Sequence, residues 1–203
     1  MKKPLLFLLV FFSVNCCLAN DLETLGNQLS NFSLSPTKDN FSYFQQNADK
    51  FEKELKSSGN GADIMVAVMT ARISEKYNWP IANTFFSKQA EEIIEGKSDL
   101  AQFINNDDLV NPAKLDLWWA SYFATGDEKY LHKLLRFAGE EFPEGDTAKL
   151  MVIGAATWSF KSNCNQHKSI RDFAKKMSTD KNLSQKKRDF LIEAVNHADD
   201  KGT

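Results

Sequence analysis

The chain has 203 residues, of which 42% are hydrophobic and 26% are charged, and its 25 Lys and Arg nearly balance its 27 Asp and Glu. This composition is typical of an ordinary globular protein, and it excludes collagen-like, low-complexity and wholly disordered chains. Three cysteines are too few for a disulfide-stabilised scaffold, so a hydrophobic core has to supply the stability.

Residues 1–19 have the pattern of a secretory signal peptide. Two lysines precede an apolar run over 5–12, and Cys17 and Ala19 are the small residues before a cleavage site that follows Ala19. The run is too short to cross a bilayer and no later segment is longer, so no transmembrane span is expected. We therefore expect an exported protein, periplasmic or secreted, and the pattern favours a bacterial periplasmic one.

The cysteines give one alternative. A lipoprotein would use Cys16 or Cys17 as its anchor, but the residues before either cysteine match the usual lipoprotein pattern poorly. After cleavage Cys164 is the single cysteine that remains, so no internal disulfide can form.

Residues 20–40 are polar and contain Gly and Pro, which indicates a weakly ordered arm with at most one helical turn, at 22–29. From residue 41 the apolar residues recur with helical spacing. We expect one all-helical domain over 41–199, followed by a disordered tail at 200–203.

The first part of this domain shows three helical patterns. Apolar residues follow helical spacing over 41–55, and 62–74 is apolar nearly all round, which is typical of a buried helix. A third apolar stripe over 82–94 is closed by Gly96, and Ser98 caps a short helical turn.

Start and stop signals divide the second half into further helices. A helix is expected over 112–125, starting at Asn111-Pro112, and a second one is capped by Asp127 and stopped by Gly139. A third helix is expected over 147–160, a fourth follows Ser169, and a fifth is capped by Ser184. A loop is expected over 161–167. No strand pattern appears, so the predicted fold is all-α, with about eight helices in antiparallel hairpins stacked as a short solenoid or an irregular bundle.

A short sequence recurs along these helices. Ala113-Lys114-Leu115 is repeated 35 residues later as Ala148-Lys149-Leu150. The segment 112–145 resembles a degenerate tetratricopeptide repeat, because its residues follow the order and spacing of that family at Trp118, Trp119, Tyr122, Gly126, Ala138 and Pro143. It departs from the family at Trp119 and Leu131, where small residues are expected. The resemblance implies stacked helix pairs with a concave surface that binds a protein or peptide.

Cys164 and His167 form the one candidate catalytic pair. A neighbouring imidazole can generate the thiolate that nucleophilic catalysis needs, which would suit a thiol-dependent hydrolase or transferase. No diagnostic motif surrounds the two residues, and a structural role is the alternative.

The segment 168–188 is strongly basic, since residues 161–188 hold nine Lys and Arg against two Asp, a net charge of +7. Lys175, Lys176 and Lys187 could bind an anionic surface. The alternative is a solvated face that complements the acidic remainder of the chain. Aromatic residues are nearly absent between these charges, so nucleic acid is not an expected ligand.

Trp118, Trp119 and Tyr122 are candidate binding residues. Adjacent residues on a helix diverge by about 100°, so one tryptophan could pack inside while the other faces a groove or a subunit contact. Core packing of both is the alternative.

No sequence motif for a metal or another cofactor is present, and none is expected. The sequence therefore predicts a non-enzymatic module that binds a protein or peptide. A thiol enzyme and an anion-binding surface protein are the alternatives, and the oligomeric state stays open.

Overall fold

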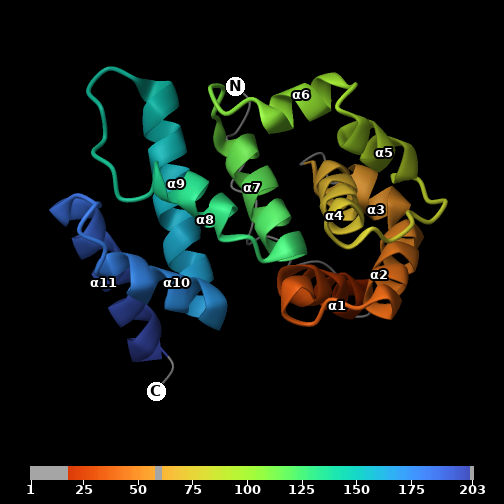
Figure 1. The fold of residues 1–203 in the computed structure, drawn as a ribbon, viewed down its shortest axis with the longest axis horizontal. Helices are drawn as coiled ribbons and strands as arrows, with labels where there is room; N and C mark the ends of the chain where they lie inside the picture. The colour runs from red at the N-terminus through yellow and green to blue at the C-terminus, as the bar shows by residue number, and fades with distance from the viewer. Residues whose placement is uncertain (1–17, 58–60, 202–203) are drawn as a thin grey trace. The chain divides into compact units, whose positions relative to one another are not determined.

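The computed structural model describes residues 18–57 and 61–201, and Figure 1 shows them as helices joined by turns and loops. These residues form eleven α-helices, one short 3-10 helix and no strand, which confirms the all-α class but exceeds the expected number of helices. The elements are α1 (Leu18–Asn31), η1 (Phe32–Leu34), α2 (Lys38–Lys50), α3 (Glu52–Ser57), α4 (Ala62–Tyr77), α5 (Ser87–Glu95), α6 (Asp99–Asn105), α7 (Pro112–Thr125), α8 (Glu128–Leu135), α9 (Thr147–Gln166), α10 (Lys168–Ser178) and α11 (Gln185–Lys201).

Two predicted segments lie largely or partly outside the described residues. The signal peptide is outside apart from Leu18 and Ala19, which begin α1. The tail expected at 200–203 is helical at its first two residues, which end α11, and its last two residues lie outside the description.

The chain divides into two compact units where a single domain was expected over 41–199. Unit 1 comprises the described residues up to Leu109 together with Asp116–Asp127. Unit 2 comprises Val110–Leu115 together with the described residues from Glu128 onward.

The segment expected to be a weakly ordered arm is mostly helical. Residues 18–31 form α1, whose leucines recur with helical spacing, and Leu25 is buried. Thr37 then starts α2, because its Oγ1 atom accepts a hydrogen bond from the backbone N–H of Asn40 at 3.1 Å. The polar composition that indicated an arm therefore belongs to the exposed faces of two short helices.

Helix α4 lies at the centre of unit 1, in contact with α2, α3 and α5 (Figure 1). Its residues from Val66 to Ala71 are all buried, as the apolar sequence over 62–74 predicted. The rings of Phe41, Phe44 and Phe86 are also buried and extend this core.

The stripe over 82–94 is only partly helical, which corrects the prediction of one continuous helix. Asn78 has a left-handed backbone conformation with φ 53°, and residues 78–86 lead into α5 without forming a regular helix. The side chains of Gln45 and Asp49 accept hydrogen bonds from the backbone N–H groups of Ala82 and Phe85, at 2.7 and 2.9 Å. Contacts with α2 thus replace the hydrogen bonds that a helix would have made.

Three of the predicted helix starts are confirmed by their hydrogen bonds. Ser98 accepts from the N–H of Ala101 at 3.1 Å, and Asn111 accepts from the N–H of Lys114 at 2.9 Å. Ser184 accepts from the N–H of Lys187 at 3.3 Å. Capping depends on neighbouring residues alone, which is why the sequence locates these starts accurately.

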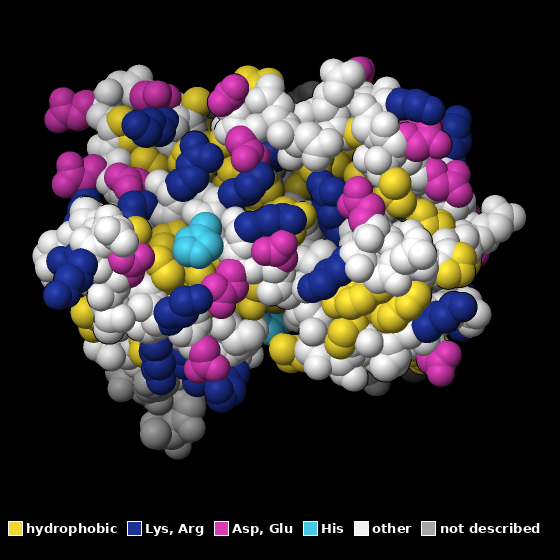
Figure 2. Space-filling view, in the orientation of Figure 1, with side chains coloured by type: hydrophobic (Ala, Val, Ile, Leu, Met, Phe, Trp, Pro, Cys, Tyr) yellow, Lys and Arg dark blue, Asp and Glu magenta, His cyan; other side chains and the backbone are white. Residues whose placement is uncertain are grey.

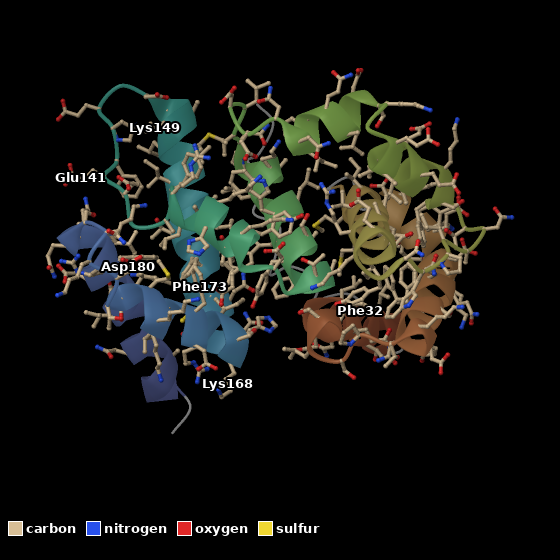
Figure 3. All side chains as sticks on the ribbon, in the orientation of Figure 1. Phe32, Glu141, Lys149, Lys168, Phe173 and Asp180 are labelled. Carbon is tan, nitrogen blue, oxygen red and sulfur yellow. The ribbon has the colours of Figure 1, made fainter. Side chains whose placement is uncertain are left out.

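Helix α9 is the longest element of unit 2, and it contacts α8, α10 and α11. It continues to Gln166, so the loop predicted at 161–167 is wrong. This segment contains neither Gly nor Pro, and its Asn163 and Cys164 side chains are buried. The ring of Phe173 from α10 packs near the rings of Phe160 and His132 inside this unit (Figure 3).

None of the described helices combines the length and the apolar character needed to cross a membrane.

Candidate functional site

Cys164 lies in the last turns of α9, and none of its surface is exposed. A nucleophilic thiol has to be accessible to its substrate. Because Cys164 is fully buried, a substrate has no access to its sulfur. Next to this turn, Arg171 of α10 donates hydrogen bonds to the backbone carbonyls of Cys164 and Asn165, at 3.3 and 3.0 Å. These bonds satisfy backbone carbonyls at the C-terminal end of α9, so Arg171 has a structural role there.

His167 joins α9 to α10 and is partly buried. Its backbone N–H donates to the carbonyl of Asn163 at 2.9 Å, and burial lowers the pKa of its imidazole. The lowered pKa favours a neutral imidazole, which could act as a base. The nucleophile that such a base would serve has no exposed surface.

The candidate aromatic residues of α7 are buried. Trp118 and Trp119 are 1% and 0% exposed, and Tyr122 is 4% exposed. The indole of Trp119 stacks on the ring of Phe123 with a centroid distance of 5.8 Å, and it meets the ring of Tyr122 edge-on at 6.3 Å. The structure therefore places both tryptophans in packing positions, and neither forms part of an exposed groove.

Many side chains of the basic segment form ion pairs with acidic residues of the same unit. Lys176 pairs with Glu128 at 2.7 Å, and Lys186 pairs with Glu141, which lies on the loop after α8, at 2.9 Å (Figure 3). The pKa of Asp172 is lowered mainly by a hydrogen bond from Lys168. Lys175 is exposed, and its positive charge lowers the pKa of Asp172 further. Figure 2 shows basic and acidic side chains interspersed over unit 2, so the viewed face has no continuous basic surface.

Lys187 makes several polar contacts at once. Its ammonium group pairs with Glu140 at 2.8 Å and donates to the backbone carbonyls of Leu135 and Arg136, at the end of α8. A cation at a helix C-terminus satisfies carbonyls that have no partner within the helix. Lys187 therefore links α11 to α8, and its side chain is only 13% exposed.

A different part of unit 2 exposes apolar side chains. Met151 and Trp158 of α9 are each 40% exposed, and their separation of seven residues places them on the same side of the helix. Gly154 and Ala155 lie between them on that side, and a Cβ atom built on Gly154 would meet nothing within 4 Å. We call these four residues the α9 face.

The opposite side of α9 is fully used in packing. Val152, Ile153, Ala156 and Phe160 are at most 4% exposed, and they face the helices that α9 contacts. Leu150, next to the α9 face, is 43% exposed. Helix α9 thus carries more apolar side chains than the rest of the described chain covers.

The sequence predicts a helix over 147–160 but does not identify the α9 face. The available signal was the apolar character of α9 on every side, because a helix at the surface of a unit buries only one side. Which side stays exposed depends on where α8, α10 and α11 pack, and the local sequence does not contain that information.

Within the described residues, no three His, Cys, Asp or Glu side chains are grouped so that they could hold a metal ion. A scan of protein-family models, a search of curated proteins and a search of solved structures each found no match to this chain.

Proposed function

We propose that this chain is an exported, non-enzymatic helical module that binds a partner protein through the α9 face. The single observation that carries the proposal is the exposed apolar surface of Met151 and Trp158 on a helix whose other side is fully packed. Export is supported by the signal-peptide pattern of residues 1–19. The sequence of segment 112–145 and the recurrence of Ala-Lys-Leu after 35 residues support a tetratricopeptide-like architecture.

The chemistry of the α9 face favours an apolar helix as the occupant. Gly154 and Ala155 have small side chains and lie between two large ones, and a Cβ atom on Gly154 would meet nothing within 4 Å. Small residues on a helix surface let the ridge of a second helix approach closely. Trp is the residue type most enriched among energetically dominant contacts, and Met adapts its shape to a partner. We therefore expect the partner to present an amphipathic helix.

The two alternatives have less support. The thiol enzyme would need access to Cys164, which is buried. The anion-binding surface would use Lys176 and Lys187, but both already interact with acidic side chains or carbonyl oxygens of unit 2.

A photocrosslinking residue in place of Ala155 tests the proposal in the native cell extract. We expect it to capture one protein, and the same residue at Leu34, which is 64% exposed on unit 1, to leave that protein uncaptured. With the captured protein purified, Trp158→Lys should weaken binding at least tenfold, because truncating a dominant contact costs about 2 kcal/mol or more. Phe142→Lys, at another exposed aromatic residue, is the matched control.

Equal affinity of the wild type and Trp158→Lys would contradict the proposal. Crosslinking from position 155 to a second copy of this chain alone would also contradict it, and would assign the α9 face to self-association.

A further inference from the structure

Unit 1 contains a pocket between α1, η1 and α2, with a volume of about 200 Å³. Three side-chain amides and three aromatic rings line it, together with one serine, and no lining residue is charged. The lining side chains used below are Gln28, Asn31, Phe32, Asn40, Tyr43 and Phe44. The pocket belongs to unit 1 alone, so it is independent of the α9 face.

The amide of Gln28 gives the pocket an unmet hydrogen-bonding group. Its Oε1 atom exposes less than 1 Å², and within the described part of the chain it accepts no hydrogen bond. A buried carbonyl oxygen without a donor destabilises the folded state, and such groups in proteins are usually satisfied by water or a ligand. The position therefore calls for a hydrogen-bond donor from outside the chain.

The two asparagines of the pocket are held by their own nitrogen atoms. Asn31 donates through Nδ2 to the carbonyl of Asn27 at 2.8 Å, and Asn40 donates through Nδ2 to the carbonyl of Ser35 at 2.8 Å. These bonds fix the amide planes and leave the Oδ1 atoms as acceptors. A pocket lined by three such amide groups favours a ligand that carries hydrogen-bond donors.

The aromatic rings of the pocket set a second requirement for its ligand. Phe32 and Phe44 are buried at the pocket, at 6% and 1% exposed, whereas Tyr43 is 53% exposed at its edge (Figure 3 labels Phe32). Aromatic faces stabilise an apolar surface of a ligand, and the phenol of Tyr43 adds a polar group at the rim. A ligand for this pocket needs one apolar face and a polar edge.

We infer that the pocket binds a neutral sugar ring. Hydroxyl groups supply the donors that the amide oxygens need, and the C–H face of the ring packs on Tyr43. An anion would meet acceptor oxygens, and a cation would find no carboxylate among the lining residues. The volume is below the roughly 300–1,000 Å³ of pockets for drug-sized ligands, which suits one ring.

Titration of the full mature chain with methyl β-glucoside, followed by the side-chain amide signals in ¹H–¹⁵N NMR spectra, tests this inference. We expect the signals of Gln28, Asn31 and Asn40 to shift with a dissociation constant in the millimolar range. Glucuronate and glucosamine, which carry a negative and a positive charge, should cause no such shift. A cello-oligosaccharide that binds tenfold more tightly would identify a glycan chain as the source of the ring, and equal affinity would identify the free sugar.

Two variants connect the binding to the pocket. Gln28→Leu should weaken the glucoside at least tenfold without lowering the thermal unfolding midpoint, because it removes a buried oxygen that has no partner. Tyr43→Ala, at an exposed ring, should also weaken binding. Gln46→Leu, the same change at an exposed position of α2 outside the pocket, should leave the affinity unchanged.

Absence of any amide shift at saturating glucoside would overturn the inference. So would unchanged affinity in Gln28→Leu or in Tyr43→Ala. Neither result bears on the α9 face, so this inference and the proposed function fail separately.

Discussion

The surroundings of single residues in this protein depend on contacts with residues that are far away in the sequence. Gly139 has a φ of 72°, and its backbone N–H donates to the hydroxyl of Thr157 at 3.0 Å. A Cβ atom at this position would lie 2.6 Å from Cγ of Phe190, close to the backbone of α11. The sequence predicted this glycine as a stop signal after α8, and the tertiary structure adds a close approach to α11.

Replacing Gly139 should therefore affect stability in two ways. Gly139→Ala is expected to lower the free energy of unfolding by about 2 to 4 kcal/mol, through the left-handed backbone and the contact with Phe190. Gly145→Ala, where φ is 78° but nothing lies within 4 Å, should lose only about 1 to 2 kcal/mol. Urea denaturation of both variants gives the comparison, and equal losses would show that the contact with Phe190 has no energetic effect.

At the scale of one element, the C-terminal part of α9 differs most from its prediction. The sequence predicts a loop over the mostly polar segment 161–167. Helix α9 nevertheless continues, since Lys161 pairs with Glu193 of α11 at 2.6 Å and Asn163 donates to the carbonyl of Ser159 at 2.9 Å. The polar side chains thus find partners while the helix is maintained.

A proline at position 162 distinguishes a helix from a loop. Ser162→Pro should lower the free energy of unfolding by about 3 kcal/mol, because proline lacks the N–H of the helical hydrogen bond and its ring clashes with the preceding turn. Ser162→Ala should change stability by only a few tenths of a kcal/mol. Circular dichroism with urea denaturation measures both, and a proline tolerated as well as alanine would place residue 162 in a loop.

At the scale of the whole molecule, one buried carboxyl group links stability to pH. Asp116 of α7 is partly buried, and burial raises the pKa of its carboxyl group from 3.8 to about 7. Between pH 3.8 and about 7, the folded chain therefore keeps a proton on Asp116 that the unfolded chain releases. The contribution of Asp116 to stability is accordingly largest below this range and decreases as the pH rises through it.

The variant Asp116→Asn isolates this contribution. Relative to this variant, the wild type should lose up to about 1.4 kcal/mol of unfolding free energy for each pH unit between 3.8 and about 7. Asp108→Asn, at an exposed loop residue, is the control and should follow the wild-type pH dependence. Parallel curves for the wild type and Asp116→Asn would contradict the raised pKa.

The helical class and several helix starts can be predicted from the residues along the chain, because helical spacing and capping depend on neighbouring residues. The caps at Ser98, Asn111 and Ser184 show this directly. Local composition misled where polar residues met distant partners, as in the residues before α5 and at the end of α9. It also misled in α1, where polar residues lie on the exposed face of a helix.

Which apolar side chains stay exposed, and which polar groups line one pocket, follows from long-range packing. Met151 and Trp158 resemble core residues in the sequence, and their exposure follows from the packing of α8, α10 and α11 on the other side of α9. Gln28 and Asn40 come from two different helices, and the sequence does not show that they line one pocket. Burial is a property of long-range packing, so the candidate sites, unlike the helices, could not be predicted from the residues around them.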